Sequence, residues 1–180
     1  MFYGAGNVAL FGGSGRDVLI INSTMGCTPY KVVANGGAGD DLITYDRYEG
    51  NTALTATGGE GADTFQLLGI GGLETLTITD FAVGPGGDRL DVRYLFNAEM
   101  RATDPYTAGV LLLAESGGAT VVTRDRDGRA GPETAYMVAT VANVTPAGLK
   151  DSIVWTDAPT GAAAAPLDLV GQAPDFFQAG

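Results

Sequence analysis

Three ungapped segments of the sequence combine glycines with an aspartate at a spacing that suits a metal ion. Each reads G-G-x-G-x-D-x-U-x, where U is a large apolar residue, and they cover residues 12–20, 36–44 and 58–66. Their aspartates are Asp17, Asp41 and Asp63. A glycine-rich turn can direct several backbone carbonyls toward one point where a β-carbon would block them, and Asp adds an anionic oxygen. Calcium prefers such a cage of about six to eight oxygens, so the segments predict calcium-binding turns.

The segments resemble the nonapeptide repeat of RTX (hemolysin-type) proteins. That resemblance implies a parallel β-roll, in which two nonapeptides form one turn of about 18 residues. The segments start at residues 12, 36 and 58, so the steps are 24 and 22 residues (36 − 12 and 58 − 36) and leave room for short insertions. We therefore expect an all-β fold, with a parallel β-roll whose three signatures stack on one edge and an antiparallel β-rich part after it.

The resemblance also implies a set of ligands for each ion, which would lie between two successive turns. One turn would supply the carbonyls of positions one and three with its Asp, and the next turn those of positions two and four with its Asp. The first site would use Gly12, Ser14 and Asp17 with Gly37, Gly39 and Asp41. The second site would use Gly36, Ala38 and Asp41 with Gly59, Gly61 and Asp63. Asp40 is expected to face solvent or to lie just behind the residues that contact the ion.

The opposite edge of the roll should lie about nine residues before each signature. There, the position of the aspartate is occupied by Val8, Val32 and Leu54. We expect this edge to bind no calcium, because it has lost its carboxylates.

Other acidic groups allow more than one interpretation. Asp80, Asp88 and Asp91 flank the turn that closes the roll, where they could bind a further calcium ion or act as turn caps and solvated charges. The stretch 124–128 resembles part of an EF-hand loop, but Thr123 and Thr134 would then occupy positions one and twelve. A charged hairpin turn is the better interpretation there.

Composition excludes several classes of function. The chain has 21 acidic and 10 basic residues and a net charge of −11, which disfavours binding to nucleic acid or to an anionic membrane. It has no His and one Cys, Cys27, so it cannot form a cysteine–histidine zinc site or use imidazole catalysis. No apolar run reaches the length of a membrane span, and no spacing singles out a catalytic pair of carboxylates. We expect a non-enzymatic protein without membrane insertion.

Three parts are expected along the chain. Residues 1–92 form the roll with its closing segment, in which 76–92 resembles the I-x-D-F…G-x-D-x-I-D-L end of RTX rolls. Residues 93–159 form a β-rich capping and secretion-target region, with a short helix at 93–102 and antiparallel strands at 109–114, 119–123 and 136–141. Residues 160–180 are an Ala/Pro/Gly-rich tail.

These features lead to two hypotheses. The first is a calcium-binding module that drives folding after type I secretion of an extracellular bacterial protein, with calcium ions and the type I secretion apparatus as partners. In this hypothesis the turns indicate the calcium, and the resemblance to RTX proteins implies the export route. The second is a ligand-binding module of an adhesin, surface-layer protein or carbohydrate-active enzyme, with a surface polysaccharide or protein as its partner. Both place the chain outside the cell or at its surface.

Overall fold

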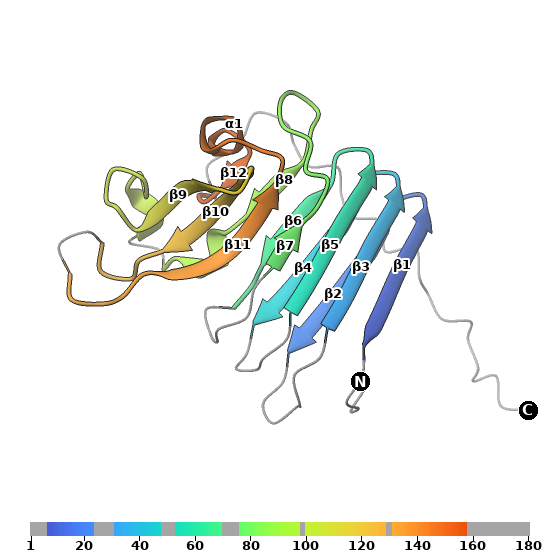
Figure 1. Ribbon diagram of the computed structural model, residues 1–180, viewed down its shortest axis with the longest axis horizontal. Helices are drawn as coiled ribbons and strands as arrows, with labels where there is room; N and C mark the ends of the chain where they lie inside the picture. Colours follow the sequence, from blue (N-terminus) through green and yellow to red (C-terminus); the bar gives the residue numbers. More distant parts are fainter. Residues whose placement is uncertain are drawn as a thin grey trace, which may run out of the picture.

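The protein is built almost entirely of β-strands, as expected (Figure 1). The computed structural model describes residues 7–23, 31–47, 53–69, 76–97, 100–128 and 131–157. The expected tail at 160–180 and Cys27 lie outside these ranges. None of the described helices is long and apolar enough to cross a membrane.

The N-terminal part is a roll of two parallel sheets between which the chain alternates. The first sheet contains β1 (Val8–Ser14), β3 (Lys31–Ala38), β5 (Ala53–Glu60) and β7 (Leu76–Ile78). The second contains β2 (Val18–Ser23), β4 (Leu42–Arg47), β6 (Thr64–Leu67) and β8 (Arg89–Asp91). The expected parallel β-roll is therefore confirmed.

The register of both sheets stacks the three glycine–aspartate segments. Gly13, Gly37 and Gly59 are partners across β1, β3 and β5. On the other sheet, Val18 pairs with Leu42 and Leu42 with Thr64. The turns at 12–17, 36–41 and 58–63, here called the first, second and third turns, thus lie one above another on one edge.

Both sheets continue beyond residue 92. In the first sheet, β11 (Tyr136–Ala142) pairs in parallel with β7, and β10 (Ala119–Arg124) and β9 (Leu111–Ser116) follow in antiparallel order. In the second sheet, β12 (Ile153–Val154) pairs with β8, after the short helix α1 (Pro146–Lys150). The expected antiparallel strands are present, and they extend the sheets of the roll to seven and five strands.

The expected helix at 93–102 was wrong. The chain forms two short 3-10 turns instead, η1 (Arg93–Leu95) and η2 (Met100–Ala102). Phe96 follows η1 in an extended conformation, with φ −117° and ψ 142°, and both Leu95 and Phe96 are buried. A continuous helix could not adopt this extended residue, so core packing of the two side chains overrides the local helical pattern.

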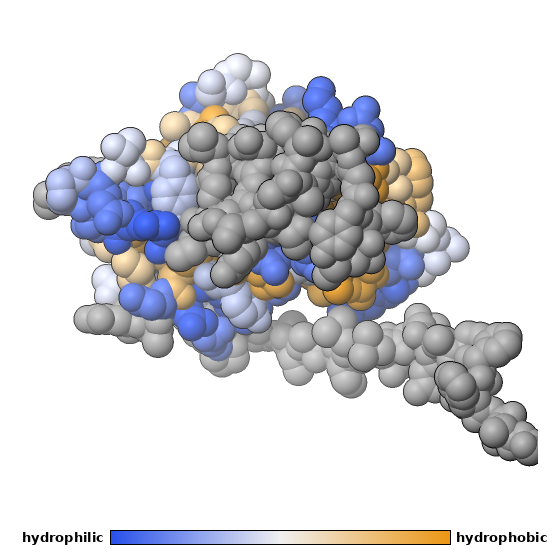
Figure 2. Space-filling view, turned by 90° about the horizontal axis from the view of Figure 1, so that it is seen from below, coloured by the Kyte–Doolittle hydropathy of each residue, from blue (hydrophilic) through white to orange (hydrophobic). Residues whose placement is uncertain are grey.

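Alternation along each strand directs one set of side chains into a single core between the sheets. Its largest fully buried members include Tyr45, Phe65, Ile43, Leu54 and Leu90. Val32 and Leu54, expected on the opposite edge, are strand residues of this core, and Val8 packs against it. From below, the described surface is mainly hydrophilic, with small apolar patches between (Figure 2).

The close stacking of turns makes a specific demand on Gly37. Its φ is +111°, and an added β-carbon would overlap the carbonyl oxygen of Gly13 in the first turn. Gly13 itself has a φ of +113° but no neighbour within 4 Å of an added β-carbon. Both glycines therefore adopt a positive φ, but only at Gly37 would a β-carbon also overlap a neighbouring turn.

We predict that Gly37→Ala destabilises the folded protein more than Gly13→Ala. In both variants the alanine at positive φ lowers the free energy of unfolding by about 1–2 kcal/mol. Gly37→Ala lowers it by about 1–3 kcal/mol more, because its β-carbon overlaps the first turn. Chemical denaturation in calcium would measure both variants. Equal losses would mean that the turns are not stacked this closely.

Candidate metal site in the stacked turns

The aspartates of the three turns form a hydrogen-bonded row. The amide of Asp17 donates to Oδ1 of Asp41 at 2.8 Å, and the amide of Asp41 donates to Oδ1 of Asp63 at 2.9 Å. The amide of Asp63 then donates to Oδ1 of Asp88 at 2.9 Å. Each carboxylate thus reaches back to the preceding turn and fixes the spacing between turns.

The second oxygen of each repeat aspartate is buried without a hydrogen-bond partner. This holds for Oδ2 of Asp17, Asp41 and Asp63. Asp41 and Asp63 are only 2% and 1% exposed. A buried carboxylate oxygen without a donor is costly, so each of these positions suits a cation. This row of unpaired oxygens is the local observation that fits calcium to the turns.

The first glycine of each signature makes room for that oxygen. Oδ2 of Asp41 lies against Gly36, and Oδ2 of Asp63 lies against Gly58, where a β-carbon would overlap it. Any larger residue at position one would therefore push the carboxylate out of the turn. The glycine–aspartate spacing follows from this contact.

Backbone carbonyls also face the gaps between turns, and their positions differ from those that the RTX resemblance implies. The carbonyls of Gly13 and Gly15 lie against Gly37 and Gly39 of the second turn. The carbonyl of Gly36 faces back to Gly12, and that of Ala38 accepts from the amide of Gly15 at 2.7 Å. The gap between the first two turns is therefore faced by the carbonyls of positions two and four of the first turn and positions one and three of the second.

The second gap repeats this arrangement. The carbonyls of Gly37 and Gly39 lie against Gly59 and Gly61, and the carbonyl of Gly58 faces back to Gly36. The carbonyl of Glu60 accepts from the amide of Gly39 at 2.7 Å. By the same repeat, Gly12 and Ser14 direct their carbonyls away from the second turn. Each gap is thus flanked by the two aspartates assigned to it, but the carbonyls that face it come from the other positions, because the positive φ of positions two and four sets their direction. Calcium binding by these residues stays a prediction.

Burial raises the pKa values of two of the repeat aspartates, Asp41 and Asp63. Burial raises the pKa of Asp63 to about 6, and the nearby carboxylates of Asp88, Asp41 and Asp80 add to it. Burial also raises the pKa of Asp41, with contributions from Asp17 and Asp40, although the hydrogen bond from the Asp17 amide opposes the rise. Without a cation, the folded state therefore favours protonation of Asp41 and Asp63 more than the unfolded state does.

Asp88 is a fourth member of the row, which the repeat signature does not reveal. Asp88 is 25 residues after Asp63 (88 − 63), close to the steps of 24 and 22, and this spacing could have revealed it. It differs from the others because both of its oxygens have donors: Oδ1 the amide of Asp63, and Oδ2 the amide of Ala82 at 2.8 Å. Burial raises its pKa as well.

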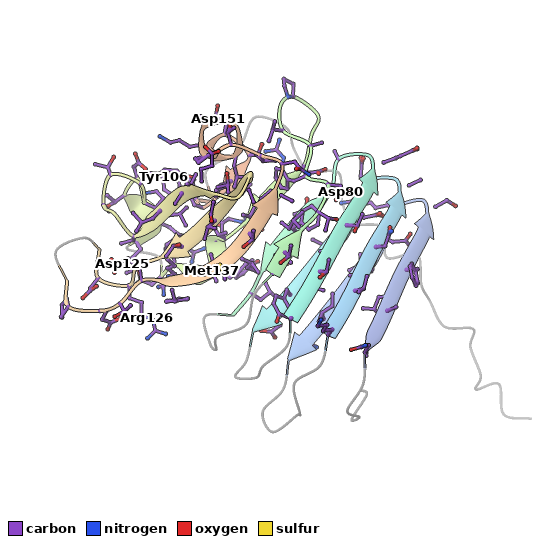
Figure 3. All side chains as sticks on the ribbon, in the orientation of Figure 1. Asp80, Tyr106, Asp125, Arg126, Met137 and Asp151 are labelled. Atoms are coloured by element: carbon purple, nitrogen blue, oxygen red, sulfur yellow. The ribbon has the colours of Figure 1, made fainter. Side chains whose placement is uncertain are left out.

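Asp80 and Asp91 are also bound by protein groups. Asp80 lies at the turn end of the roll and accepts from the amides of Gly58 and Gly59, both at 2.9 Å (Figure 3). Asp91 pairs with Arg93 at 2.8 Å and accepts from Gln66 at 3.0 Å. Burial opposes ionisation of Asp91, but these hydrogen bonds outweigh it and lower its pKa. For the closing segment, the hydrogen bonds favour capping over a further metal site.

The remaining acidic candidates do not gather into a site. Asp40 is exposed and accepts from the amide of Ala62 at 2.9 Å. Asp125 accepts from the amide of Asp127 at 3.3 Å, as in a charged turn. Within the described ranges, no three His, Cys, Asp or Glu side chains are grouped to hold a metal by themselves. A metal in the turns would therefore depend on backbone carbonyls together with two carboxylates.

Comparison with known proteins agrees with the fold. No family model matches the chain, and no curated protein matches it. Among solved structures, it is similar to the AlgE6R3 subunit of the Azotobacter vinelandii mannuronan C5-epimerase, at 25% identity and a TM-score of 0.54. That match covers 94% of this chain and 88% of the other. The AlgE6R2 subunit of the same enzyme matches at 22% identity and a TM-score of 0.36, over 87% of this chain and 96% of the other.

We predict that the metal-free protein loses stability as pH rises through about 6. The raised pKa of Asp63 means that the folded state binds its proton more tightly than the unfolded state. The resulting stabilisation is complete below the unfolded pKa of about 4 and is lost as pH rises through the folded value, at a cost on the order of 2 kcal/mol. Thermal melts in metal-free buffer from about pH 4.5 to about pH 7.5 would measure this loss.

The matched variant for this prediction is Asp63→Asn, which keeps an acceptor for the Asp41 amide and removes the titrating charge. Its metal-free melting temperature should change much less over the same range. A wild-type protein that becomes more stable toward neutral pH without metal would contradict the prediction.

Proposed function

We propose that the chain is a non-catalytic, calcium-binding β-roll module of a secreted protein, and that calcium drives its folding. The observation that carries the proposal is the row of buried, unpartnered Oδ2 atoms on Asp17, Asp41 and Asp63. One ion between the first and second turns and one between the second and third would neutralise these carboxylates. Each would take four carbonyls and two carboxylates.

The energetics of the row support a folding role. Adjacent strands are about 4.8 Å apart, so ionised aspartates in register repel one another until a cation lies between them. For sites with a dissociation constant of about 0.1 mM, millimolar calcium contributes about 1.4 kcal/mol each, or roughly 3 kcal/mol for two. Since domains are typically stable by about 5–15 kcal/mol, this contribution can decide whether the roll folds.

Calcium-dependent folding would suit a protein that is exported from the cell. Calcium is scarce in the cytosol and abundant outside, so a chain that needs it stays unfolded before export and folds afterwards. In this proposal the chain leaves through a type I secretion apparatus, as its resemblance to RTX proteins implies, and works outside the cell.

A second candidate is a polysaccharide-binding module. It is supported by the similarity to a subunit of an enzyme that acts on mannuronan, over most of both chains. A glycan array probed with the calcium-loaded protein would separate the two functions. Binding to a defined glycan would favour the second, and calcium-dependent folding without glycan binding would favour the first.

Removal of calcium should unfold the roll. After chelation, circular dichroism should report loss of β-structure and a lower melting temperature, and added calcium should restore both. Magnesium at the same concentration is the control, because its small, rigid octahedral shell suits a carbonyl cage poorly. Spectra and melting temperatures that do not respond to calcium would refute a calcium-driven fold.

Within the row, Asp41 should matter most, because it faces both gaps. Asp41→Asn should lower the number of bound calcium ions by two, and Asp17→Asn or Asp63→Asn by one, as measured by equilibrium dialysis. Asp40→Asn is the matched control: it removes one charge from the same turn, but its side chain is exposed. Equal losses for all three row variants, or an equal loss for Asp40→Asn, would mean that the ions do not lie between these turns.

A further inference from the structure

The N-terminal end of the roll presents two open strand edges. In the described part of the chain, β1 begins the seven-stranded sheet and β2 ends the five-stranded sheet, so each pairs on one side only. β1 reads VALFGGS and β2 reads VLIINS, with no charged residue and no proline in either. Long, uncharged edges of this kind are templates for pairing with another strand.

The edges at the other end of the sheets differ in the features that prevent pairing. β9 carries Glu115, and β12 is only two residues long and follows Lys150 and Asp151. Charged and very short edge strands are the usual protection against pairing between molecules. Among the residues that the structure describes, β1 and β2 have neither form of protection.

Apolar side chains are exposed along the same two strands. Phe11 on β1 is 73% exposed, and Ile20 and Val18 on β2 are 60% and 45% exposed. An apolar group left in water at an unpaired edge gains from burial against a partner. The edge therefore offers backbone groups and apolar side chains at the same place.

We infer that this end of the roll pairs with the same end of a second copy of the chain. β1 and β2 run in opposite directions on either side of the first turn (Figure 1). A two-fold rotation about an axis parallel to the strands therefore sets β1 of one copy antiparallel to β2 of the other, and β2 to β1. Two symmetric ladders form at once, as in an isologous dimer. Phe11 of one copy then lies on the same surface as Val18 and Ile20 of the other.

Charge favours this contact over others between two copies. Each chain carries a net charge of −11, so most pairs of surfaces would bring carboxylates together. The strands β1 and β2 contribute none. Because the contact consists of two short ladders, it is smaller than the roughly 1,200–2,000 Å² of a stable interface, and the dimer should form at high protein concentration only.

The test is sedimentation velocity of the full chain in calcium over about a hundredfold range of concentration. The wild type should shift from monomer to dimer, and Ile20→Lys and Phe11→Lys should each raise the dissociation constant about tenfold or more. Met137→Lys is the matched control, since Met137 is an exposed apolar residue of β11, four strands from β1 (Figure 3). It should leave dimerisation unchanged.

Hydrogen exchange supplies a readout of backbone pairing. Amides in 8–14 and 18–23 should exchange more slowly as the concentration of the wild type rises, and not in Ile20→Lys. A protein that stays monomeric throughout, or whose association the two lysine variants do not weaken, would overturn the proposal. So would slow exchange of these amides in the monomer, because another segment of the chain would then cover the edge.

The dimer contact depends on the proposed function in one respect: the strand edges form only when the roll is folded. Circular dichroism on the same samples keeps the two apart. A chain that is folded and dimeric after chelation would refute calcium-driven folding and support the edge contact. A chain that folds with calcium and stays monomeric would do the reverse.

Discussion

The fold depends on how each repeat aspartate divides its two oxygens. Oδ1 accepts the amide of the preceding turn, as Asp41 does for Asp17, and Oδ2 is buried within its own turn without a donor. The first bond sets the spacing of the turns, and the second oxygen is left in a position that suits a cation. Position one must be glycine because Oδ2 of Asp41 fills the space of a side chain at Gly36. A single arrangement of carboxylates thus explains the register and the glycines, and it is the basis on which we propose metal binding.

The two ends of the roll meet this constraint differently. At the C-terminal end, Asp88 receives donors on both oxygens, and Asp80 caps the third turn through the amides of Gly58 and Gly59. There, β7 and β8 are also covered by β11 and β12. At the N-terminal end, Asp17 has an unpaired Oδ2, and β1 and β2 have no further described neighbour. The row is therefore satisfied by protein donors at its C-terminal end, while toward the N-terminal end its Oδ2 atoms have no described donor.

The sequence allowed the fold to be predicted further than the details of the site. Three repeats at near-constant steps determine which strands are neighbours, and alternation determines which side chains face the core, so the roll and the antiparallel strands were predictable. The direction of each carbonyl was not, because it follows from the positive φ of Gly13, Gly15 and their equivalents. Asp88 was noted as a possible ligand or turn cap, but its place in the row was missed because its turn lacks the G-G-x-G-x-D signature. Phe96 broke the expected helix because burial outweighs local propensity.

Metal binding and pairing at the open edge are coupled if both occur. The first turn joins β1 to β2 and faces the first gap, so an ion there stabilises the two strands that form the edge. By linkage, a partner that binds only the ordered edge must strengthen calcium binding in that gap by the same factor that calcium strengthens pairing. The second gap is farther from the edge and closer to the capped end, so it should share less of this coupling. The stacked geometry therefore makes the first ion the more sensitive of the two to the state of the N-terminal edge.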